Sequence, residues 1–125
     1  MRRVFLDTAV LALAVGGEHP LRTVCRRYLE EAAAGELALH VSVEALQELL
    51  FHRMRRGERA DAIAVVRDIH ALCYAHPFDD AVVTRMLDLV ATTNLGGRDA
   101  VHAATALTAG FSSIITPDSD FDGVP

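Results

Sequence analysis

Short apolar, β-branched segments alternate with amphipathic helical segments along the whole chain, and this alternation limits the folds open to it. The predicted strands lie at residues 4–6, 37–41, 73–78 and 113–116. The predicted helices between them span residues 8–15, 21–34, 42–56, 59–72, 79–90 and 99–109. Strands that alternate with helices are typical of a mostly parallel sheet covered on both faces. We therefore predict an α/β fold with three layers, α/β/α, around a central sheet of four to five strands.

The length and composition favour one domain, residues 1–125, with a well-buried core. A hydrophobic share of 51% and a mean hydropathy of +0.24 exclude a disordered chain. Aromatic residues make up only 6%, which argues against an aromatic platform that stacks a run of bases. Cys25 and Cys73 are isolated in the sequence and are predicted to be reduced core residues. No segment is long enough for a membrane span and none fits a signal peptide, so we expect a cytoplasmic location.

Carboxylates lie on, or directly after, four of these apolar elements. They are Asp7 after the first strand, Glu48 in the third helix, Asp99 at the start of the last helix, and Asp118 after the last strand, followed by Asp120. Since the carboxyl ends of parallel strands meet at one edge of a sheet, Asp7 and Asp118 are expected to lie close together. Taken singly, each acid has another interpretation as a helix cap, a turn residue or a solvated side chain, and Glu44 is a rival to Glu48.

The ordered set of segments resembles the PIN domain family, and specifically the VapC-type toxins of type II toxin–antitoxin modules. The resembling segments are Leu6-Asp7-Thr8, Ser42-x5-Glu48-Leu49, Arg98-Asp99-Ala100-x-His102-x-Ala104 and Thr116-x-Asp118-x-Asp120-Phe121. The resemblance implies a PIN-like fold with site acids at Asp7, Glu48, Asp99 and Asp118, and Asp120 as an occasional fifth. The offset from Ser42 favours Glu48 over Glu44. The resemblance also places the hydroxyls of Thr8 and Thr116 near the site.

By the same resemblance, we expect an endoribonuclease that hydrolyses RNA phosphodiester bonds, is held inactive by a cognate antitoxin and forms homodimers. Gathered carboxylates repel one another unless a cation lies among them, and their oxygen atoms suit Mg²⁺ or Mn²⁺. Zn²⁺ is disfavoured because the motifs offer no His and Cys set at its spacing. We expect Asp7, Asp99 and Asp118 to ligate the metal, with Asp120 as a further ligand. Glu48 would bind the metal or position the attacking water.

Family members usually continue past the last segment into a further strand, whereas this sequence ends at Pro125. A short or missing edge strand is therefore expected.

The net charge of −5 is unfavourable for binding a polyanion. Without the five candidate acids, however, 12 acids remain against 12 arginines, so the rest of the chain is neutral. A basic cluster of Arg53, Arg55, Arg56 and Arg59 either contacts RNA phosphates or forms a solvated charged face.

Other acidic α/β proteins fit the sequence less well. A response-regulator receiver needs a lysine, and this chain has none. A haloacid-dehalogenase phosphatase needs a second aspartate where Ala9 stands, two residues after Asp7. A different class of function, a non-catalytic protein-interaction module, stays open as the alternative.

Overall fold

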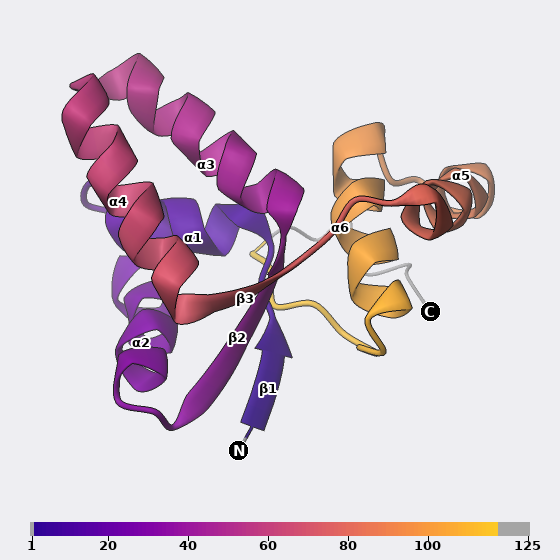
Figure 1. Ribbon diagram of the computed structural model, residues 1–125, viewed down its shortest axis with the longest axis horizontal. Helices are drawn as coiled ribbons and strands as arrows, with labels where there is room; N and C mark the ends of the chain where they lie inside the picture. Colours follow the sequence, from indigo (N-terminus) through magenta and orange to yellow (C-terminus); the bar gives the residue numbers. More distant parts are fainter. Residues whose placement is uncertain (1, 118–125) are drawn as a thin grey trace.

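The described part of the computed structural model, residues 2–117, contains a parallel sheet of three strands in the order β1-β2-β3 (Figure 1). The strands are β1 (Arg2–Phe5), β2 (Leu37–Ser42) and β3 (Cys73–His76). Phe5 pairs with His40, and Ser42 pairs with His76, so the strands end close to the same edge. The expected α/β fold with a parallel sheet is confirmed.

In the described part of the chain, six helices occupy the connections between and after the strands. They are α1 (Thr8–Val15), α2 (Arg22–Ala33), α3 (Val43–Arg56), α4 (Arg59–Leu72), α5 (Asp80–Thr92) and α6 (Gly97–Thr108). Asp7, Ser42 and Asp79 start three of them as N-caps, because each side chain accepts a hydrogen bond from a backbone N–H of the first turn. No helix within the described residues is long and apolar enough to cross a membrane.

Helices α1 to α4 lie on one side of the sheet, and α5 and α6 lie on the other (Figure 1). Successive side chains of β2 point to opposite faces of the sheet. Leu37, Leu39 and Val41 join the main core with residues of α1, α3 and α4. A second cluster joins α5 and α6 and includes Val82, Leu89, Ala100, Ala103 and Ala104. The small residues of α6 allow a close approach, so that this helix packs against β2 and α3.

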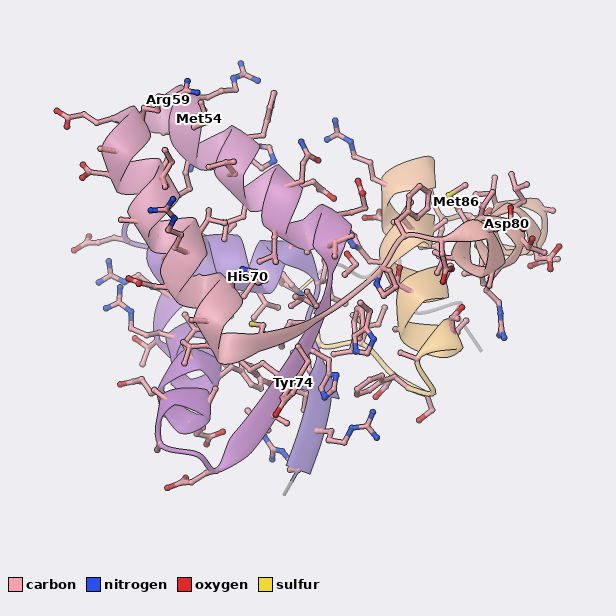
Figure 2. The ribbon with its side chains drawn as sticks, viewed as in Figure 1. Met54, Arg59, His70, Tyr74, Asp80 and Met86 are labelled. Atoms are coloured by element: carbon pink, nitrogen blue, oxygen red, sulfur yellow. The ribbon has the colours of Figure 1, made fainter. Side chains whose placement is uncertain are left out.

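On the face of the sheet toward α6, strands β2 and β3 carry the rings of His40, Tyr74 and His76. The His40 ring stacks on Tyr74 and His76, with centroid distances of 4.9 and 5.0 Å, and the edge of Phe111 covers it. A hydrogen bond of 2.8 Å joins His40 Nδ1 to His76 Nε2. Tyr74 forms the outer edge of this ring cluster and is exposed (Figure 2).

Within residues 2–117 the sheet has three strands, fewer than the predicted four to five. Residues 113–116 were expected to form a strand, but the structure records only one parallel bridge, between Leu6 and Ile115. Ile115 donates to the Phe5 carbonyl and accepts from the Asp7 N–H, at 2.8 and 3.0 Å. Pro117 then follows and has no N–H to extend the pairing. The further strand expected near the end of the sequence lies outside the described residues.

Smaller differences concern where elements begin and end. The third strand ends at His76, not at Phe78, because Pro77 interrupts it. Helix α6 begins at Gly97, two residues before Asp99, so Asp99 lies in its first turn. Cys25 and Cys73 are both free thiols, as expected.

Candidate functional site

The N-terminal acid of the predicted set, Asp7, lies at the junction of β1 and α1 and is 5% exposed. Its Oδ1 accepts the Thr8 N–H at 2.8 Å, which is the N-cap bond, and its Oδ2 accepts the Thr116 hydroxyl at 2.8 Å. Burial raises the pKa of this carboxyl, and the nearby charge of Glu48 raises it further. The hydrogen bond from Thr116, the charge of His102 and the bond from Thr8 oppose the rise in pKa. Asp7 is therefore both a helix cap and a carboxylate held in a site that disfavours its charge.

Glu48 of α3 reaches across to α6. Its Oε1 lies 2.7 Å from Nε2 of His102, a side chain that is 1% exposed. The same Nε2 is 3.1 Å from the Thr8 hydroxyl, and Nδ1 is 2.7 Å from the Ser42 hydroxyl. His102 thus contacts Thr8 at the start of α1, Ser42 at the N-cap of α3, and Glu48.

The partners of His102 define its proton positions. A carboxylate only accepts hydrogen bonds, so Nε2–H donates a hydrogen bond to the Glu48 carboxylate. Ser42 Oγ already accepts the Ala45 N–H at 3.0 Å, and its own proton is directed to Nδ1. With Nε2 as the donor and Nδ1 as the acceptor, the ring suits Glu48 and Ser42, whereas the Thr8 hydroxyl can only share the single Nε2 proton, as inferred from the bonding network.

The described residues bring Asp7 and Glu48 close enough for the charge of Glu48 to raise the pKa of the Asp7 carboxyl. Asp99 is half-buried and lies one turn before His102 on the same face of α6. Asp118 and Asp120 lie outside the described residues. Thr116, two residues before Asp118, holds Asp7 Oδ2, so residues 7 and 116 meet although 109 positions separate them.

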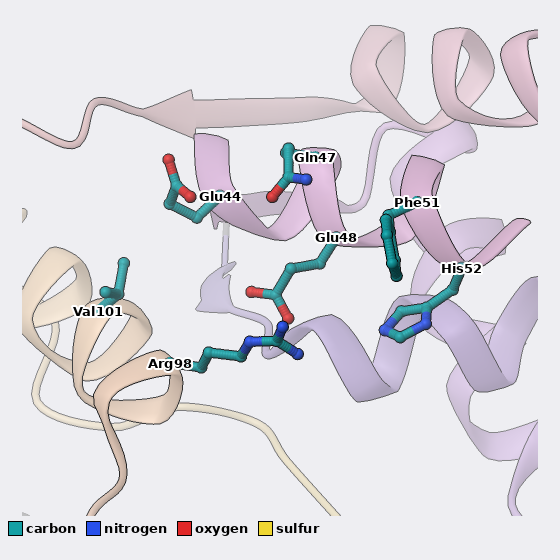
Figure 3. Close-up of a pocket in the computed structure, with 7 residues that line it drawn as sticks. All are labelled: Glu44, Gln47, Glu48, Phe51, His52, Arg98 and Val101. Carbon is teal, nitrogen blue, oxygen red and sulfur yellow. The ribbon is translucent and has the colours of Figure 1, made fainter. Parts of the chain in front are cut away.

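Glu44 and Glu48 lie one turn apart on α3, and their carboxylates point in different directions. Figure 3 shows the Glu48 carboxylate pointing toward Arg98 of α6, whereas the Glu44 carboxylate points to another side. Glu48 also bonds to His102, which bonds in turn to Thr8 beside Asp7. The geometry therefore favours Glu48 over Glu44 as the site glutamate.

His102 is a candidate site residue to which the sequence assigned no role, although it lies in one of the resembling segments. The available signal was a polar residue among Ala100, Ala103 and Ala104, all of which pack inward. A buried histidine on such a helix needs partners for both ring nitrogens. Those partners are 54, 60 and 94 residues away, so the sequence could not identify them.

The donor set suits a hard divalent cation. Within residues 2–117 no three His, Cys, Asp or Glu side chains form a group that could hold a metal ion. Asp7 and Glu48 nevertheless supply carboxylate oxygens from two elements, and the groups that donate to the buried Asp7 carboxylate, the Thr8 N–H and the Thr116 hydroxyl, are both uncharged. A positive ion would offset the unfavourable burial of its charge. The residues present therefore fit Mg²⁺ or Mn²⁺ as part of a ligand set.

A sequence profile of the PIN domain matches residues 4–125, and the chain belongs to this family. Over 121 residues it is 38% identical to Ribonuclease VapC7 of Mycobacterium tuberculosis, covering 94% of this chain and 83% of that protein.

Two solved structures share the fold. VapBC2 from Rickettsia felis, bound to a DNA fragment from its promoter, superposes with a TM-score of 0.77 at 13% identity, over 98% of this chain and 93% of that chain. A toxin–antitoxin complex from Klebsiella pneumoniae gives a TM-score of 0.75 at 19% identity, over 98% and 92% of the two chains.

Proposed function

We propose that this protein is an endoribonuclease that hydrolyses RNA phosphodiester bonds with the help of Mg²⁺ or Mn²⁺, and that it is the toxin of a toxin–antitoxin pair. The observation that carries the proposal is the buried Asp7 carboxylate, held next to the Glu48–His102 pair beyond the ends of β1 and β2. The relative VapC7 is named a ribonuclease, and a chain of the same fold forms a toxin–antitoxin complex.

In this proposal, Asp7, Asp99 and Asp118 hold the metal, and Asp120 is a further ligand. The hydroxyl of Thr116 and the N–H of Thr8 each engage one oxygen of Asp7, which fixes the plane of the carboxylate. Each oxygen keeps a lone pair for a cation. When bound, the divalent ion supplies charge neutralisation at the scissile phosphate and lowers the pKa of an attached water.

Glu48 has the role of orienting the water that attacks phosphorus. Its Oε1 accepts the proton of His102 Nε2, which limits the rotation of the carboxylate and leaves Oε2 to accept a hydrogen bond from water. His102 does not need to reach the substrate for this role. It positions Glu48, and Ser42 positions His102 in turn.

The decisive experiment is RNA cleavage by the purified protein in Mg²⁺, in Mn²⁺ and in EDTA, together with the variants Asp7→Asn and Asp79→Asn. Asp79 is a matched control, since it also caps a helix through its side chain but lies on α5, away from the site. We expect cleavage by the wild type and Asp79→Asn with metal, and a loss of at least about a hundredfold in Asp7→Asn. Equal cleavage by Asp7→Asn and the wild type would refute the proposed site.

The same experiment separates this function from that of a non-catalytic interaction module, for which no cleavage and no metal dependence are expected. A cognate antitoxin, homodimer formation and a cytoplasmic location belong to the proposal as well. Co-purification with the antitoxin followed by light scattering tests the first two.

A further inference from the structure

A hollow of about 180 Å³ lies between α3 and α6, immediately beside the Glu48 carboxylate (Figure 3). Its lining residues are Glu44, Gln47, Glu48, Phe51 and His52 from α3, and Arg98 and Val101 from α6. The α3 residues recur at the spacing of one helix face, which therefore runs along the hollow. Because Glu48 belongs to both, the hollow is continuous with the proposed site of phosphodiester cleavage.

The residues that line the hollow offer three kinds of contact to a ligand. Phe51 presents an aromatic ring that is 47% exposed, although a large apolar side chain gains from being covered. Gln47 and Glu44 offer an amide and a carboxylate, which pair with the edges of nucleobases. Arg98 supplies a guanidinium at the first turn of α6, where the helix end also favours an anion. An aromatic face, polar edges and an adjacent cation match a nucleotide.

We propose that this hollow binds one nucleotide of single-stranded RNA beside the scissile phosphate, with Phe51 stacked on its base and Arg98 on its phosphate. The inference rests on the proposed ribonuclease function and adds a specificity site to it. Glu44 and Gln47 accept hydrogen bonds from an amino group on the base, so a base with an exocyclic amino group is favoured over uracil.

The surrounding charges are arranged to suit this occupant. Within residues 2–117 Arg98 takes part in no ion pair, and its guanidinium points toward Glu48 in Figure 3. The Arg55 guanidinium lies over the Phe51 ring, 5.5 Å from its centre. A second cation is therefore next to the stacking ring, which suits a base joined to phosphates. Arg53 has a different contact, because its guanidinium donates a hydrogen bond of 2.7 Å to the Val15 carbonyl.

An apolar peptide side chain is a poorer occupant than a base. Only Phe51 and Val101 among the lining residues are apolar, and the remaining five are charged or polar. An apolar group that filled the hollow would desolvate Glu44 and Gln47 without giving them partners. A base covers the ring and also pairs with these groups.

The test measures binding of a fluorescent single-stranded RNA to the full chain, in an Asp7→Asn background that prevents turnover. Phe51→Ala is compared with Phe78→Ala, since Phe78 is 41% exposed and lies outside the hollow. Loss of one base–aromatic stack weakens binding about 10- to 100-fold, so this loss is expected for Phe51→Ala and not for Phe78→Ala. Phe51→Trp keeps the affinity. Arg98→Ala reduces the slope of log affinity against log salt by about 1.

RNAs that lack the base at one position at a time complete the test. The effect of Phe51→Ala should disappear for a single abasic position, because the stacking partner is then already absent. An equal effect at every position, or equal binding by Phe51→Ala and Phe78→Ala, overturns the proposal. Failure of the wild type to cleave RNA, combined with the position-specific loss, would refute the ribonuclease function and retain the nucleotide site.

Discussion

Replacing Asp7 by Asn should make the protein more stable while abolishing its activity. Asp7 is 5% exposed, and burial is the largest influence on its pKa, which is raised above 3.8. The folded carboxyl therefore binds a proton more readily than the unfolded one does. The protonated carboxyl therefore stabilises the folded state relative to the unfolded one. This contribution to the free energy of unfolding is fully present below pH 3.8 and is lost as the pH rises through the folded pKa. At neutral pH the ionised side chain lowers the stability of the fold.

The magnitude follows from the linkage between pKa and stability. Each unit by which folding raises the pKa costs about 1.4 kcal/mol of unfolding free energy once the group is ionised. Asn carries no charge, caps a helix as well as Asp does, and has an oxygen for the Thr8 N–H. The Thr116 hydroxyl can turn to accept from the new amide. We therefore expect Asp7→Asn to raise the free energy of unfolding; a typical single substitution changes it by about 1 kcal/mol, or about 3 °C in Tm for a domain of this size.

The assay is thermal and urea unfolding of the wild type, Asp7→Asn and Asp79→Asn in EDTA at pH 7.5. The exposed Asp79 should shift by less than about 0.5 kcal/mol. In saturating Mg²⁺ the order reverses, because an ion that binds only the folded wild type stabilises it by about 2.7 kcal/mol at a hundred times its Kd. If Asp7→Asn is less stable than the wild type in EDTA, the hydrogen bonds to the carboxylate outweigh its burial and the reasoning is wrong.

Two further predictions concern histidines. His102→Ala removes the contact of Glu48 Oε1 and the acceptor of the Ser42 proton and opens a cavity, so unfolding should become easier by about 2–4 kcal/mol in urea titrations. Ser42→Ala loses the cap and the bond to His102 Nδ1 but opens little space, so its cost should be smaller, about 1–2 kcal/mol. Similar losses in both variants would contradict the central place of His102. Burial lowers the pKa of His40 and of His76, so the unfolded chain binds more protons and stability should fall as the pH drops below 6.5. The pH dependence of Tm should be flatter in His76→Phe than in the wild type, and identical curves would exclude this pair as its source.

The strand and helix pattern was predictable because local signals agree with the fold. Asp7, Ser42 and Asp79 cap helices in the structure, and Ser and Asp are residue types that favour this position. Residues 113–116 have the composition of a strand, yet only Ile115 pairs, because the next residue but one is Pro117. Strand length there depends on pairing with β1, which composition does not report.

The candidate site was predictable only in part. Asp7 follows from the rule that ligands bind beyond the ends of parallel strands. Glu48 looks like a surface residue of an amphipathic helix, and its position near the site depends on packing between α3 and α6. The hydrogen bonds of His102 depend on the same packing, so no local pattern could reveal them.

The contact between Thr116 and Asp7 has a consequence for the order of events during synthesis. Ile115 and Thr116 secure the first strand and the first acid, across 109 positions of the chain. A ribosome that has made β1 to β3 and α1 to α6 has produced most of the core but not the donor that fixes Asp7. The site is therefore incomplete on the nascent chain until residue 116 has emerged, and a truncated product would carry the fold without the assembled acids.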